Sequence, residues 1–99
     1  MRALVHVIPA AVRELLRGMP LSDGKVEFAW RTAVGPVFDR ATAVKLEGPV
    51  LLVETASDEW AREIRRSTGT ILERLQAFLG RDTVTRIDVR LNPGLKPGV

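Results

Sequence analysis

The chain has 99 residues, of which 45% are hydrophobic and 27% are charged. It is therefore long enough for one domain with a buried core and is not disordered by composition. It contains no cysteine and a single histidine, His6, which excludes disulfides, thiolate nucleophiles and zinc–thiolate sites, and most histidine-based metal sites. The net charge is +3. An arginine-rich surplus of this kind favours a phosphate-bearing or acidic partner, although it follows equally from a GC-rich genome.

Membrane attachment is not expected, because no apolar run approaches the roughly 18 residues that a membrane span needs. The first residues, MRALVHVIPAAV, resemble a weak signal peptide. However, His6 and Pro9 interrupt them, and an amphipathic segment follows directly. We therefore predict a cytoplasmic protein that does not contact a membrane.

The chain begins with an ambiguous segment and a predicted helix. Residues 1–8 fit either an irregular start or a short apolar segment. Pro9 suits the first turn of a helix, and residues 12, 15 and 16 are apolar at helical spacing. Gly18 and Pro20 end this helix.

A second helix is predicted after Ser22 or Asp23, because either side chain can cap a helix. Gly35-Pro36 interrupts or kinks the helix, and residues 37–38 add a further turn. The apolar stripe of this helix contains Val26, Ala29, Trp30, Ala33 and Val34.

Residues 42–46 and 50–55 predict two strands. The connection Glu47-Gly48-Pro49 is short and contains glycine, so an antiparallel hairpin is expected. In the second strand, residues 51, 53 and 55 share one face, and residues 50, 52 and 54 share the other.

Residues 57–80, SDEWAREIRRSTGTILERLQAFLG, predict one helix around which the fold is organised. Ser57 can cap it, Asp58 and Glu59 suit the positive end of its dipole, and Gly80 can end it. A helix of this length spans roughly 30 Å. Its apolar stripe covers about a third of the circumference and contains Trp60, Ile64, Thr68, Ile71, Leu72, Leu75, Phe78 and Leu79.

Residues 83–91 predict a half-buried strand, because apolar and charged positions alternate. Its predicted inward residues are Thr85, Ile87, Val89 and Leu91, and its outward residues are Arg86, Asp88 and Arg90. A β-α-β crossover allows this strand to lie parallel to its neighbour.

The resulting order, α-α-β-β-α-β, predicts an α+β, KH-like fold in which a three-stranded sheet packs against the long helix. We predict three regions along the chain. Residues 1–19 form an N-terminal helical segment, residues 20–92 form the KH-like domain, and residues 93–99 form a short tail.

Catalysis has little support in the sequence. His6 is the only imidazole, and no glycine-rich phosphate loop of the Walker or dinucleotide type is present. Asp58, Glu59 and Glu63 form a carboxylate cluster. However, their spacing favours helix capping and pairing with Arg62 and Arg66. We predict no enzyme activity, no metal site and no cofactor.

The two tryptophans allow two interpretations. An exposed tryptophan stacks on a nucleic-acid base and contributes roughly 1–3 kcal/mol per base, whereas a tryptophan on an apolar helical stripe packs in the core. We favour the core for both. The predicted structural core is Trp30, Trp60, Ile64, Ile71 and Leu75.

The cations are the best candidates for binding. Three arginines of the long helix lie opposite its apolar stripe, and others flank the strands. Such a surface can hold phosphates without sequence preference, but a solvated, salt-bridged face explains it equally well. The candidate nucleic-acid-binding residues are Arg40, Lys45, Arg62, Arg65, Arg66, Arg86 and Arg90.

Several segments, taken together, resemble the DciA family. They are WRTAVG at 30–35, Thr42, LLVETASDEWAREI at 51–64, ILERL at 71–75 and Leu79-Gly80. Each is weak alone, but their order and spacing over residues 20–91 are fairly specific. Three features differ from what is common in the family. About eight residues follow the last predicted strand where the family often carries a long extension, Ala41 replaces a common histidine, and Gln76 replaces a common asparagine. The GxxG loop of KH domains is also absent.

The resemblance implies a KH-like domain in a bacterial protein that helps to load or operate the replicative DNA helicase and that contacts single-stranded DNA, without nucleotide hydrolysis. Our leading hypothesis is therefore a non-enzymatic replication module whose partners are single-stranded DNA (or RNA) and the replicative DNA helicase. One alternative is a protein-interaction or dimerisation domain that uses an exposed apolar surface on residues 12–17 or on the outer sheet face. Another is a KH-like RNA-binding module.

Overall fold

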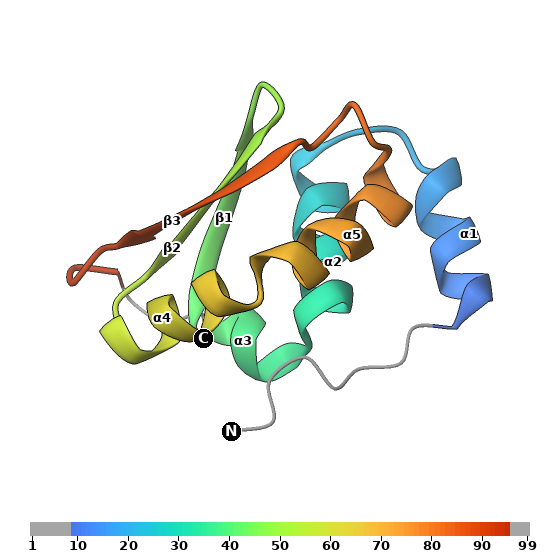
Figure 1. The fold of residues 1–99 in the computed structure, drawn as a ribbon. Helices are drawn as coiled ribbons and strands as arrows, with labels where there is room; N and C mark the ends of the chain where they lie inside the picture. The colour runs from blue at the N-terminus through green and yellow to red at the C-terminus, as the bar shows by residue number, and fades with distance from the viewer. Residues whose placement is uncertain (1–8, 96–99) are drawn as a thin grey trace.

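The computed structural model of this protein describes residues 9–95, and Figure 1 shows its elements. The helices are α1 (Ala10–Gly18), α2 (Asp23–Val34), α3 (Pro36–Arg40), α4 (Asp58–Arg66) and α5 (Thr68–Leu79). The strands are β1 (Thr42–Glu47), β2 (Val50–Thr55) and β3 (Arg86–Leu91). The predicted α+β class is confirmed. Residues 1–8 and 96–99, which include His6, lie outside the described residues.

The three strands form one mixed sheet in the order β1-β2-β3. β1 and β2 form the predicted antiparallel hairpin, with Glu47 opposite Val50 and Thr42 opposite Thr55. β3 lies parallel to β2, as the crossover through two helices allows. β1 and β3 are therefore the two edges of the sheet.

One face of the sheet is buried beneath the helices and the other is open. Leu51, Val53 and Thr55 of β2 are buried, as are Ile87 and Val89 of β3. The prediction for the ends of β3 is wrong, because Thr85 and Leu91 are exposed rather than inward. The strand begins at Arg86, and the buried residue before it is Val84.

α2 supplies the centre of the core. Ser22 caps it by accepting a hydrogen bond from the backbone N–H of Lys25 at 3.1 Å. Gly35, whose φ is +89°, ends the helix, and Pro36 begins α3 in the next turn. Among the predicted core residues, Trp30, Ile64, Ile71 and Leu75 are buried, and Trp60 is half-buried with its ring centroid 4.7 Å from that of Phe38.

Lys25 is buried although it is not part of the predicted apolar stripe of α2. Its Nζ donates a hydrogen bond to the carbonyl of Met19 at 2.7 Å. The alkyl stem is therefore packed among apolar groups while the charged end reaches the carbonyl that follows α1.

The prediction of one long helix over residues 57–80 is wrong, because two helices, α4 and α5, meet at Ser67. The backbone of Ser67 leaves the helical region, with φ −103° and ψ 10°. The hydroxyl of Thr68 donates a hydrogen bond to the Arg65 carbonyl, which competes with regular helical bonding. α4 contacts β2 and β3, whereas α5 packs chiefly on α1 and α2, so the sheet is covered by separate helices rather than by one rod (Figure 1).

α1 packs on α5 and lies at the side of the molecule away from the sheet (Figure 1). Leu16 is its one buried residue within the described part of the chain. Leu15 remains 62% exposed. The first helix is thus attached to the helical layer through a narrow contact.

Candidate nucleic-acid interface

The structure divides the seven predicted binding cations among three places. Arg62, Arg65 and Arg66 lie on α4, at the end of the sheet nearest the β2–α4 turn (Figure 1). Arg40 lies at the end of α3. Lys45, Arg86 and Arg90 lie on the open face of the sheet. All seven are exposed, but they do not form one continuous basic surface.

On α4, the predicted ion pairs are present. Arg62 Nη2 lies 3.1 Å from Asp58 Oδ2, and Arg66 Nη1 lies 3.4 Å from Glu63 Oε1. The two arginine side chains are 67% and 75% exposed. Surface ion pairs of this kind contribute only about 0–1 kcal/mol to stability. Arg62 and Arg66 can therefore leave their acid partners at little cost in free energy.

Arg65 has a different contact. Its Nη2 donates a hydrogen bond to the Val89 carbonyl at 3.2 Å. β3 is an edge strand, so this guanidinium covers part of an otherwise open edge. The bond also fixes α4 beside β3.

The open sheet face alternates in charge. Across the three strands, Ala43, Glu54 and Arg90 form one row, Lys45, Leu52 and Asp88 form the next, and Glu47, Val50 and Arg86 form the third. Arg90 pairs with Asp88 at 3.0 Å, and Lys45 lies 3.9 Å from Glu47. Each cation therefore has an acid nearby on the same face, and the face is not a basic patch.

A basic cluster that the sequence analysis did not single out lies where α1 meets the end of α5. Arg13, Arg17 and Arg81 line a hollow of about 450 Å³ together with Glu73. Within residues 9–95, none of the three arginines forms an ion pair with an acid within 4 Å. The i,i+4 spacing of Arg13 and Arg17 was visible in the sequence, but the approach of Arg81 depends on how α1 packs.

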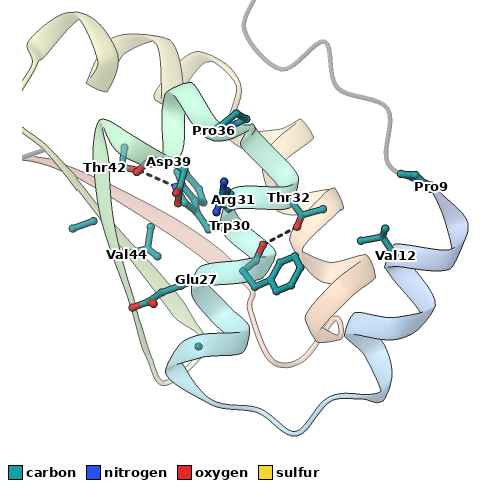
Figure 2. A pocket seen from close by; sticks show the side chains of 13 residues that line it. Pro9, Val12, Glu27, Trp30, Arg31, Thr32, Pro36, Asp39, Thr42 and Val44 are labelled. Carbon is teal, nitrogen blue, oxygen red and sulfur yellow. Dashed lines mark hydrogen bonds between the residues drawn. The ribbon is translucent and has the colours of Figure 1, made fainter. Parts of the chain in front are cut away.

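A groove of about 900 Å³ lies between α2 and β1 (Figure 2). At its base, Trp30 Nε1 donates a hydrogen bond to Thr42 Oγ1 at 2.8 Å. Asp39 lies at one end, where burial raises the pKa of its carboxyl group, and the nearby charge of Arg31 opposes that rise. Phe28, on the α2 wall, is 46% exposed.

Residues 9–95 contain no group of three or more histidine, cysteine or acidic side chains that is able to hold a metal ion. Over the same residues, no helix has the length and apolar character needed to cross a membrane. The Asp58, Glu59 and Glu63 carboxylates lie on α4, where Asp58 and Glu63 pair with arginines.

The sequence model of the DciA family, described as "Dna[CI] antecedent, DciA", matches residues 3–89, which is most of the chain and includes every helix and nearly all of the sheet. No curated protein matches the chain.

Proposed function

We propose that this chain, which belongs to the DciA family, acts in replicative-helicase loading by binding single-stranded DNA through arginine contacts to the phosphates. The resemblance found in the sequence is thus confirmed. Proteins of this family are non-enzymatic helicase loaders. Membership of the family implies that the chain interacts with the replicative helicase. The DNA contact and a cytoplasmic location are our proposals.

The observation that supports a DNA contact is the hydrogen bond between Arg65 and the Val89 carbonyl. It brings the arginines of α4 beside the exposed edge of β3. We call Arg62, Arg65 and Arg66 the α4–β3 surface. Arginine forks match phosphate oxygens in geometry, and a row of cations at a sheet edge can follow a single-stranded backbone.

The acids on this surface weaken the attraction without preventing it. Each exposed ion pair contributes about 0–1 kcal/mol, which is less than a charge-assisted bond to phosphate provides. The other candidates, Arg40, Lys45, Arg86 and Arg90, are weaker. Arg40 lies apart on α3, and the other three share the open sheet face with acids.

The Arg13, Arg17 and Arg81 cluster is the rival phosphate surface. Its arginines have no acid partner within 4 Å among residues 9–95, although Glu73 lines the same hollow. The two surfaces lie on different elements, so substitutions can separate them.

The test is fluorescence anisotropy with a labelled oligothymidylate, titrated at several salt concentrations. The wild-type chain should bind at low salt, and log K should fall with log salt at about −0.7 per phosphate contact. The variant Arg62→Gln, Arg65→Gln and Arg66→Gln should bind at least about tenfold more weakly. The matched control, Arg13→Gln and Arg17→Gln, should bind as the wild type does.

Circular dichroism of each variant must show an intact fold, because Arg65 also supports β3. Absence of binding at low salt, or equal binding by the triple variant, would remove the DNA contact at this surface. If only the control variant, Arg13→Gln and Arg17→Gln, lost binding, the DNA contact would be assigned to the Arg13, Arg17 and Arg81 cluster. Competition by an RNA strand of equal length separates DNA from RNA binding.

A further inference from the structure

The free edge of β1 directs backbone hydrogen-bonding groups away from the sheet. The carbonyl of Thr55 accepts a hydrogen bond from the Asn92 N–H at 2.8 Å, on the β3 side of β2. Thr55 therefore does not use this carbonyl toward its partner Thr42, and the two form a non-hydrogen-bonded pair of the hairpin. Because the pattern alternates along a strand, the backbone N–H and C=O of Val44 and Leu46 also point outward.

The two edges of the sheet differ in how they are covered. At β3, the Arg65 guanidinium donates to the Val89 carbonyl. At β1, no residue in the described part of the chain makes a hydrogen bond to the outward backbone of Val44 or Leu46. An uncovered edge is a template for another strand, and native proteins usually protect such edges.

A groove follows this edge. Its larger part is lined by the consecutive residues Thr42, Ala43 and Val44 on one side and by α2 on the other. A smaller hollow continues it along β1 to Leu46. Both parts include Val44 and Glu27, whose side chains point toward one another across the groove in Figure 2. The groove thus accompanies β1 over residues 42–46, a length of roughly 15 Å in an extended chain.

The charged side chains that line the groove favour one class of ligand over another. Asp23 and Glu27 lie at its α2 wall and Asp39 at its far end. None of these acids has an ion-pair partner within 4 Å among residues 9–95. Arg31 lies among them, while Lys45 is near Glu47. A phosphate backbone is disfavoured beside such acids, whereas a chain with lysine or arginine side chains is favoured.

We propose that an extended peptide of a partner protein, with basic side chains alternating with apolar ones, adds to the sheet as a fourth strand along β1. The peptide backbone pairs with Val44 and Leu46, as in other strand-addition complexes. Its basic side chains lie near Glu27 and Asp23, and an apolar side chain contacts the exposed ring of Phe28. This peptide site is separate from the proposed DNA surface, and neither depends on the other.

The test selects peptides from a displayed library of random octapeptides on the full chain. Enriched sequences should alternate apolar residues with lysine or arginine, and a fluorescein-labelled copy should bind in solution. The same peptide N-methylated at alternate residues keeps its charges but loses its strand-pairing donors, and should bind at least tenfold more weakly. Glu27→Lys should reduce binding at least tenfold, and the matched surface control Glu59→Lys should leave it unchanged.

Three results would overturn the proposal. They are the absence of enriched peptides, equal binding of the N-methylated peptide, and equal binding by the Glu27→Lys variant. Light scattering gives a further readout. A stable dimer of the wild-type chain that Val44→Pro converts to a monomer would assign the edge to a second copy instead.

Discussion

The indole N–H of Trp30 donates a hydrogen bond to Thr42 Oγ1 at 2.8 Å, and the Thr42 hydroxyl in turn donates to the Phe38 carbonyl at 2.8 Å. One threonine therefore joins α2, the last turn of α3 and the first residue of β1. Trp30 is 1% exposed, so its N–H has no alternative partner in water. Both residues are part of the pattern that identified the family from sequence, and this contact gives a physical reason for their pairing.

Thr42→Val should destabilise the fold by about 1–3 kcal/mol, because it removes the acceptor and leaves a buried indole N–H without a partner. Thr42→Ser keeps the hydroxyl and should cost less than about 1 kcal/mol. Urea denaturation measures both free energies of unfolding. If both variants lost the same free energy of unfolding, the stabilising group at position 42 would be the threonine methyl and not the hydrogen bond.

The elements with clear boundary residues were predictable from sequence. Ser22, Gly35 and Pro36 mark the limits of α2 and α3, and Gly48 in a two-residue turn marks the hairpin. The break at Ser67 was not predictable by periodicity, because the apolar positions of α4 and α5 continue on one stripe. A single residue that leaves the helical region changes the direction of the axis without changing that pattern.

The candidate site was predictable only in part. The i,i+3 and i,i+4 spacings predicted that Arg62 and Arg66 pair with acids of their own helix, and they do. The role of Arg65 depends on which backbone carbonyl lies beside α4, and this is set by tertiary packing. The groove along β1 was also invisible in the sequence, since it depends on which strand lies at the edge.

Gly69→Ala should stabilise the protein by about 0.5–1 kcal/mol. Gly69 lies in the first turn of α5, and a Cβ atom there would contact no atom within 4 Å. Alanine has the higher helix propensity and reduces the entropy of the unfolded chain. Gly35→Ala is the matched contrast, because φ is +89° there, and it should destabilise. Thermal unfolding measures both, and a lower midpoint for Gly69→Ala would contradict the helical assignment.

Ionisation of Asp39 should lower the free energy of unfolding as the pH rises above the ordinary pKa of an aspartate. Burial raises the pKa of its carboxyl group in the folded state, so the folded chain binds more protons than the unfolded chain between the two pKa values. The favourable contribution is present below the unfolded pKa and is lost as the pH rises through the raised one. Asp39→Asn should flatten this part of the curve of unfolding free energy against pH. An unchanged curve would show that Arg31 offsets the burial.

The acids on α4 should restrain the proposed DNA contact. Asp58→Asn with Glu63→Gln removes both ion-pair partners of Arg62 and Arg66, and it removes two charges that repel phosphate. Single-stranded DNA affinity at low salt should therefore rise at least about fivefold, since each nearby charge contributes up to about 1 kcal/mol in water. Anisotropy titrations measure the change, and the increase should shrink at high salt because screening weakens exposed charges. Glu73→Gln, beside the Arg13, Arg17 and Arg81 cluster, is the matched control. If it raises affinity and the α4 variant does not, the phosphates bind at that cluster and not along β3.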